Sequence, residues 1–250
     1  MAVSIKSARE IAMMQEAGRI LAKVHDELGQ AIHPGISTYE IDQLGEKLIR
    51  GYGCIPNFLH YNGYPASICV SVNEEVVHGI PNKNRILKEG DIVSLDAGLI
   101  YKGYHSDAAR THAVGKISDE AQKLIDVTRQ SFFEGIKLAK EGNHLHDISN
   151  AIDAYVSQFG YGIVKDLVGH GIGTQLHEDP QIPNFAQKRR GVRLQAGMTL
   201  AIEPMINAGG WEVNFLQDGW TVVSRDGSLS AHYENTILVT EGEPEILTLL

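Results

Sequence analysis

Apolar residues recur at helical spacing in two stretches near the start of the chain. Before each stretch a serine is followed three residues later by a glutamate, the capping-box pattern that marks many helix starts. The two pairs are Ser7 with Glu10 and Ser37 with Glu40. The pattern predicts a first helix that ends at about Gly29 and a shorter second helix that ends at about Gly51.

From residue 68 to residue 114 the pattern changes to short β-branched runs separated by glycine and proline, which predicts strands. Residues 119–141 and 147–159 return to helical spacing, with Asp147 as the expected N-cap of the second segment. Strands are predicted again from about residue 162 to the end of the chain. The order helix, helix, sheet therefore occurs twice.

An offset of 107 residues, the separation of Gly35 and Gly142, relates two halves at about 1–115 and 116–250. The same offset aligns further pairs: Ile41 with Ile148, Tyr52-Gly53 with Phe159-Gly160, Gly90 with Gly197, and Asp96 with Glu203. These matches indicate an ancient duplication inside one catalytic domain of residues 1–250. Each half offers a carboxylate at the same place, so we expect a site where the halves meet.

The composition is that of an ordinary globular chain, with 43% hydrophobic and 21% charged residues. The formal net charge is -9 and neither sign forms a run of five, which argues against nucleic acid as a substrate. Two cysteines are too few for a disulfide framework, and no stretch reads as a secretion signal or membrane span. We expect a cytoplasmic protein that does not enter membranes.

Four acidic residues interrupt otherwise core-like strand sequences: Asp96, Asp107, Glu203 and Glu234. A chain reversal near Tyr101 and Lys102 would set residue 96 opposite residue 107 on antiparallel strands, with both carboxylates on one face. Any one of these acids alone could face solvent or form a salt bridge. Several like charges facing one another are unfavourable unless a cation lies between them, so the set predicts a hard divalent metal ion.

The run Gly169-His170-Gly171-Ile172-Gly173, followed by His177, would bring backbone close to a ligand while presenting imidazoles. A lone histidine is more often structural, so this run is only moderately specific. It lacks the Lys-Ser/Thr pair of a phosphate-binding loop and the strand-turn-helix setting of a dinucleotide site. No nucleophile elbow occurs either, so serine or cysteine catalysis is discarded.

Over nearly its whole length the chain resembles the type I methionine aminopeptidases, in particular their short bacterial form. The resemblance rests on six motifs: Tyr61-Asn-Gly-Tyr-Pro-Ala-Ser-Ile-Cys69, Asn73-Glu-Glu-Val-Val-His78-Gly-Ile-Pro, Gly90-Asp-Ile-Val, Gly169-His-Gly-Ile-Gly, Ile202-Glu-Pro-Met and Asp218-Gly-Trp-Thr. It implies the α/β (α+β) pita-bread fold, a pseudo-twofold curved antiparallel sheet covered by helices. It also implies removal of the initiator methionine from nascent proteins.

By motif position the resemblance assigns five ligands to two divalent ions. Asp107 and Glu234 should bridge the ions, Asp96 should complete one set, and His170 with Glu203 should complete the other. Such ligands accept Mn, Fe, Co, Ni or Zn, so the physiological ion stays open. The implied reaction is attack of a metal-bound hydroxide on the first peptide carbonyl.

Three catalytic roles follow from the same resemblance. Glu203 should act as general base as well as ligand, His177 should donate to the developing oxyanion, and His78 should contact the scissile amide. The methionine pocket should be lined by Phe58, Tyr61, Tyr64, Cys69, Leu176 and Trp220, and His78 and His177 should also bind substrate. Many relatives have a cysteine in place of Phe58 and an aromatic residue in place of Leu176, so the pocket shape stays open. Both residues could instead be simple core packing.

The implied substrates are N-termini of nascent polypeptides with a small second residue. Transient ribosome contact and a monomeric state are further expectations. The chain itself begins Met1-Ala2 and should process its own start, so mass spectrometry of the native protein should find Ala2 first.

Two other functions are compatible with a fold and ligand types of this kind. Xaa-Pro aminopeptidases and prolidases share the fold and ligand types but usually carry a large extra N-terminal domain, for which 250 residues leave no room. Binding proteins with this fold that have lost hydrolysis typically lack ligands, whereas all five positions are filled here. Turnover of Met-Ala-Ser against Met-Pro and Ala-Pro peptides would separate the three.

Overall fold

The computed structural model describes residues 3–250. The predicted processing of Met1 and Ala2 concerns residues outside this range and stays a prediction. Of the helices formed by the described residues, none combines the length and apolar character needed to cross a bilayer.

The helices begin and end close to the predicted positions. They are α1 (Ala8–Gln30), α2 (Thr38–Gly51), α3 (Asp119–Ile136) and α4 (Leu145–Val156), with 3-10 turns η1 (Tyr61–Gly63) and η2 (Ser157–Phe159). The strands are β1 (Ile55–Pro56), β2 (Ile68–Val72), β3 (Glu75–Val77), β4 (Ile92–Tyr101), β5 (Tyr104–Ala113), β6 (Gly162–Ile163), β7 (Gly169–Gly171), β8 (Glu178–Ile182), β9 (Thr199–Ile202), β10 (Met205–Asn207), β11 (Val213–Phe215), β12 (Val222–Ser224), β13 (Ser230–His232), β14 (Glu234–Leu238) and β15 (Glu245–Ile246).

Across residues 3–250 the main sheet has nine strands, joined in the order β1-β4-β5-β14-β9-β7-β8, with β2 beside β4 and β15 beside β14. All of its pairings are antiparallel. Two small sheets adjoin it, β13-β10-β6 and β11-β12-β3. The pairing of β5 with β14 joins the two halves of the chain at the middle of the main sheet.

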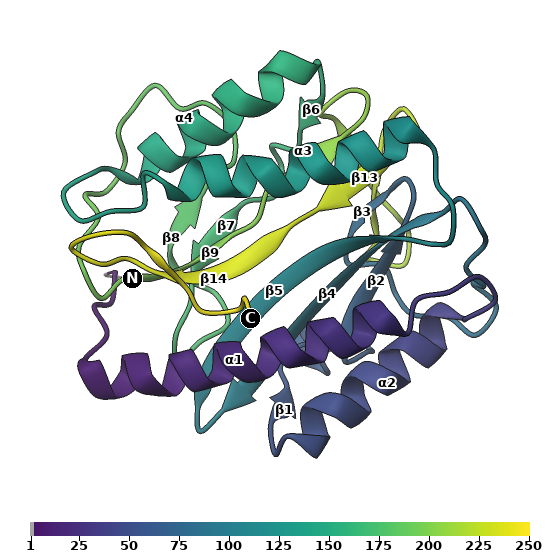
Figure 1. Cartoon of the computed structure of the whole chain (residues 1–250), viewed down its shortest axis with the longest axis horizontal. Coiled ribbons are helices and arrows are strands. Elements are labelled where there is room, and N and C mark those ends of the chain that lie inside the picture. Colours follow the sequence, from purple (N-terminus) through teal and green to yellow (C-terminus); the bar gives the residue numbers. More distant parts are fainter. Residues whose placement is uncertain (1–2) are drawn as a thin grey trace.

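The helices cover the sheet in two pairs. Figure 1 shows α1 and α2 along one half of the sheet and α3 and α4 along the other. Buried residues of α1 and α2 pack on those of β2, β4 and β5, whereas α3 and α4 pack on β9, β13 and β14. This helix-covered antiparallel sheet is the pita-bread architecture that the sequence predicted.

Both predicted capping boxes are confirmed, because Ser7 and Ser37 accept from the backbone N–H of Glu10 and Glu40 and each glutamate binds back. Two helix ends differ from prediction. α3 ends at Ile136 instead of residue 141. The N-cap of α4 is His144, and Asp147 lies three positions later, where its Oδ2 accepts from the His144 N–H at 2.8 Å.

The 107-residue offset recurs in the backbone. Gly35 and Gly142 both have positive φ angles, at 99° and 90°, and so do Gly90 and Gly197, at 96° and 92°. Left-handed backbone of this kind favours glycine. Glycines 107 residues apart therefore form turns of the same backbone conformation in the two halves. α2 and α4 also begin 107 residues apart, at Thr38 and at residue 145. We infer that the halves at about 1–115 and 116–250 descend from one duplicated unit.

The hairpin of β4 and β5 corrects one prediction. The strands reverse at Lys102 and Gly103, one residue later than expected, so Asp107 lies opposite Gly98 and Asp96 lies opposite Ala109. The two aspartates are diagonal neighbours. Because side chains alternate along a strand, this shift by two positions still keeps both carboxylates on the same face.

Candidate active site

One cavity of about 210 Å³ opens between the halves of the chain and holds every side chain that the sequence proposed for the site. Eight of these side chains were predicted for substrate, and all line the cavity: Phe58, Tyr61, Tyr64, Cys69, His78, Leu176, His177 and Trp220. The five proposed metal ligands line it as well: Asp96, Asp107, His170, Glu203 and Glu234.

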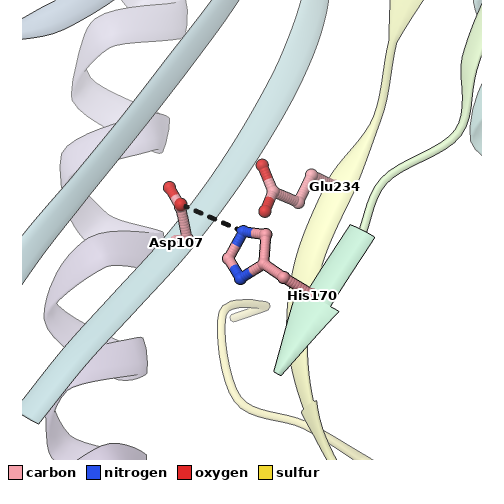
Figure 2. Close-up of side chains that lie close together, drawn as sticks. All are labelled: Asp107, His170 and Glu234. Carbon is pink, nitrogen blue, oxygen red and sulfur yellow. Dashed lines mark ion pairs between the residues drawn. The ribbon is translucent and has the colours of Figure 1, made fainter. Parts of the chain in front are cut away.

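Three of the proposed ligands converge from three strands. Figure 2 shows Asp107 of β5, His170 of β7 and Glu234 of β14 directed toward one another. Their possible ligand atoms all lie within 4.8 Å of one another. Nε2 of His170 lies 4.0 Å from Oδ2 of Asp107 and 3.5 Å from Oε1 of Glu203.

The sheet order explains why residues so distant in sequence meet. Glu234 lies opposite Ala109 on β14 and β5, so it adjoins Asp107 of the first half. β9, which leads directly into Glu203, lies between β14 and β7. Asp96 on β4 lines the same cavity, but it belongs to neither of the two groups of tightly clustered ligand atoms found in residues 3–250.

Burial strongly raises the pKa values of the four carboxyl groups. It raises the pKa of Asp96 to about 7, and it raises the pKa of Asp107, Glu203 and Glu234 well above the ordinary range. The charges of neighbouring carboxylates add to burial in raising the pKa of the last three. Negative charge on all four is therefore unfavourable in the protein alone.

The oxygen atoms of this cluster also lack partners. Within residues 3–250, Oδ1 of Asp96, Oδ1 of Asp107 and Oε1 of Glu234 are buried and accept no hydrogen bond. A buried polar atom without a partner costs free energy, so such atoms mark a missing ion or water. A divalent cation fits this set of carboxylate oxygens and one imidazole, and several transition metals accept these ligands.

The orientation and charge state of the His170 imidazole suit a metal ligand. Its Nδ1 lies 2.9 Å from the Gly171 carbonyl oxygen, which leaves Nε2 toward the carboxylates. Burial lowers the pKa of His170 to about 3, and the neighbouring His177 lowers it further. A neutral ring whose other nitrogen is held by a carbonyl is the usual form of a metal-binding histidine.

Two further histidines lie beside the cluster. The His177 ring centroid is 4.3 Å from that of His170, and its Nδ1 lies 2.8 Å from the Tyr61 hydroxyl. His78 has a positive φ of 59° on a non-glycine residue, a conformation that is uncommon and concentrates at functional sites. Burial, with His177 as a second cause, lowers the pKa of His78 to about 4, so its ring is neutral.

The other wall of the cavity is apolar and aromatic. Tyr64 packs edge-on against Trp220 with ring centroids 5.1 Å apart, and its hydroxyl donates to the Gly79 carbonyl at 2.9 Å. Burial raises the pKa of the Cys69 thiol, so that side chain stays neutral. Phe58 and Leu176 belong to the same apolar cluster and also line the cavity.

Sequence reasoning missed several side chains. The cavity is also lined by Asn62, Val77, Leu167, Val168 and Met205. His232 is a further omission, because its ring forms a second potential ligand group with Glu203 and Glu234. Its position two residues before Glu234, the side-chain repeat of extended chain, was the available signal.

Comparison with known proteins gives consistent results. Residues 12–241 match metallopeptidase family M24. The chain is 53% identical to a methionine aminopeptidase of Clostridium acetobutylicum over 99% of both chains. It is 45% identical to the solved methionine aminopeptidase of Thermotoga maritima, with a TM-score of 0.97 and full coverage of both chains.

The competing interpretation fits less well. The Xaa-Pro dipeptidase of Bacillus anthracis has a TM-score of 0.78 and 26% identity, and the match covers 98% of this chain but 61% of that one. The match therefore takes in nearly the whole of this chain and only part of that protein. The chain therefore belongs to metallopeptidase family M24 and, within it, to the methionine aminopeptidases.

Proposed function

We propose that the cavity binds two divalent metal ions and removes N-terminal methionine from nascent polypeptides. The observation that carries this proposal is the set of buried carboxylates, with unpartnered oxygen atoms, that faces the neutral imidazole of His170. Without cations such a cluster opposes folding at neutral pH. Clusters that lower the stability of a fold concentrate at functional sites, and metal binding is the function that this cluster would serve.

We assign the five proposed ligands the roles that the family resemblance implies. Asp107 and Glu234 would be shared between the ions, because they come from the two adjacent central strands β5 and β14. Asp96 would serve one ion, and His170 with Glu203 the other. When bound, such ions polarise a carbonyl group and lower the pKa of water.

The protein's own groups have distinct tasks. Glu203 would accept a proton from the attacking water as general base. The ring N–H of His177 would donate to the oxyanion that develops from the first peptide carbonyl. His78, neutral and next to Trp220, would hydrogen-bond the scissile amide.

The apolar wall of the cavity would bind the methionine side chain of the substrate. Tyr64, Cys69 and Trp220, with Phe58 and Leu176, offer aromatic, thiol and aliphatic surface to an unbranched thioether. The site would accept substrates with a small second residue. Nascent chains imply action in the cytoplasm and transient contact with the ribosome.

Peptide turnover tests the proposal. Purified protein, first stripped with a chelator, would be assayed on Met-Ala-Ser, Met-Pro and Ala-Pro peptides with added Mn²⁺ or Co²⁺. We expect rapid cleavage of Met-Ala-Ser that depends on the added ion. Preference for Ala-Pro would make the chain an Xaa-Pro peptidase, and no cleavage despite full metal loading would leave a binding protein.

A further inference from the structure

The imidazole of His232 lies next to the catalytic cluster but has no role so far. Its Nε2 is 3.7 Å from Oε2 of Glu203, while Nε2 of His170 is 3.5 Å from Oε1 of the same carboxylate. Glu203 thus lies between two imidazoles, one facing each oxygen. Nε2 of His170 also lies 4.0 Å from Oδ2 of Asp107.

The backbone around His232 holds this ring in place. His232 lies opposite Met205 on β13 and β10, and Met205 follows Glu203 by two residues. On the other side, the Thr111 hydroxyl accepts from the His232 N–H and donates to the His232 carbonyl, both at 2.9 Å. The backbone that carries the His232 ring is therefore held by β10 on one side and by Thr111 on the other.

The ring is also buried and without partners. The exposed fraction of His232 is 1%, and both ring nitrogens lack a hydrogen-bond partner among residues 3–250. A fully buried imidazole without a hydrogen-bond partner costs free energy, so its retention needs a reason. Glu203 is the polar group that Nε2 faces at the shortest printed distance.

We propose that His232 is a positioning residue whose Nε2–H donates to Oε2 of Glu203 and so directs Oε1 toward the divalent ion. This inference rests on the metal site proposed above. The 3.7 Å separation exceeds hydrogen-bond length, so the proposed contact requires the two side chains to come closer when the ion binds. Hydrogen bonds of this kind to a ligand carboxylate typically alter metal affinity by about 10–100-fold.

The experiment uses metal-free protein titrated with Mn²⁺ alone, with free ion followed by its electron paramagnetic resonance signal. His232→Leu removes the donor, whereas His232→Gln keeps an N–H at nearly the same position. We expect Mn²⁺ affinity to fall about 10–100-fold in His232→Leu and to stay within about threefold in His232→Gln. If His232→Leu fails to fold, His232→Met replaces it.

A matched control is His112→Leu. His112 lies on β5 and faces away from Asp107, against Gly29 of α1, and its Nε2 likewise lacks a partner among the described residues. This variant should bind Mn²⁺ as wild type does. Equal loss in His112→Leu and His232→Leu would show a general effect of removing a buried ring and would overturn the proposal.

Three further outcomes are decisive. Unchanged affinity in His232→Leu would overturn the positioning role. Equal losses in His232→Leu and His232→Gln, with loss of one coordinated-imidazole signal in pulsed resonance spectra, would make His232 a ligand and also overturn it. Failure of the wild type itself to bind Mn²⁺ would instead refute the underlying metal site.

Discussion

The hydroxyl of Tyr61 lies 2.8 Å from Nδ1 of His177, so a residue of the first half orients an imidazole of the second. Burial raises the pKa of Tyr61 and lowers the pKa of His177, which keeps both groups neutral. A neutral tyrosine can donate to Nδ1, and the ring proton then resides on Nε2. In that tautomer His177 presents a donor to the cavity.

Tyr61→Phe should therefore reduce turnover while leaving metal binding intact. Loss of the hydroxyl frees the His177 ring to rotate or adopt the other tautomer, and we expect kcat to fall about tenfold, equivalent to about 1.4 kcal/mol. Steady-state kinetics on Met-Ala-Ser with saturating Mn²⁺ would measure it. Tyr52→Phe, which removes a surface hydroxyl bonded to Glu27, is the matched control and should be neutral. Unchanged kcat in Tyr61→Phe would contradict the orienting role.

Replacing His177 or His78 should lower turnover without changing the metal content. Loss of one preorganised donor at an oxyanion typically costs about 10²–10³ in kcat, so His177→Ala should fall in that range. His78→Ala should lose a comparable factor. Elemental analysis of the loaded variants should show the same metal content as wild type. Loss of metal instead would mean that the missing ring is a ligand or a structural support.

Metal binding should strengthen as pH rises. Asp96, with a pKa of about 7, and its three neighbours with raised pKa hold protons that an ion must displace. Mn²⁺ affinity should increase about tenfold per pH unit for each proton released, from pH 6.5 to 8.5. Calorimetry in buffers of different ionisation enthalpy would count the protons. Affinity independent of pH would show that the carboxyls are already ionised.

The stability of the metal-free protein should change in the opposite direction. A carboxyl group whose pKa is raised in the folded protein binds a proton more tightly there than in the unfolded chain. Bound protons therefore stabilise the folded protein, and this stabilisation is lost as the pH rises through the folded-state pKa. Partly buried His112, with a pKa lowered to about 4, acts oppositely, but only below its unfolded pKa of about 6.5. Melting temperatures without metal should therefore fall from pH 6.5 to 8.5.

Asp107→Asn tests the same electrostatics by mutation. The amide removes one buried negative charge and one proposed bridging ligand. At pH 8 the metal-free variant should be more stable than wild type by at least about 1 kcal/mol, the equivalent of roughly one pKa unit. Its melting temperature should no longer rise on addition of Mn²⁺. A less stable metal-free variant would mean that Asp107 stabilises the fold by itself.

The sequence predicted the helices and the shared face of the acids because both depend on short-range periodicity. The capping serines before α1 and α2 are examples, since their partners lie three residues away. The start of α4 was missed because histidine is not among the preferred N-caps, although Asp147 supplies the returning hydrogen bond. A one-residue error in the β4–β5 turn altered the pairing without changing the face.

Features that depend on strand order escaped prediction. His232 approaches Glu203 only because β13 pairs with β10, and no local pattern in the sequence specifies that neighbour. The same holds for Leu167, Val168 and Met205, which reach the cavity from loops and a short strand. Family motifs indicated the proposed ligands, whereas the groups that surround them required the tertiary structure.

The repeated glycines offer a test of backbone conformation. Gly35 has a φ of 99°, and a Cβ added there would meet nothing within 4 Å, so Gly35→Ala introduces conformational strain without a clash. We expect it to lower the free energy of unfolding by about 1–2 kcal/mol. Gly51, at the end of α2, is the matched control, because its added Cβ also meets nothing and no left-handed φ is involved. Gly51→Ala should be neutral or stabilising by up to about 1 kcal/mol, since alanine favours helix. Urea unfolding of the two variants would measure both values, and equal effects would mean that the Gly35 turn relaxes to accept alanine.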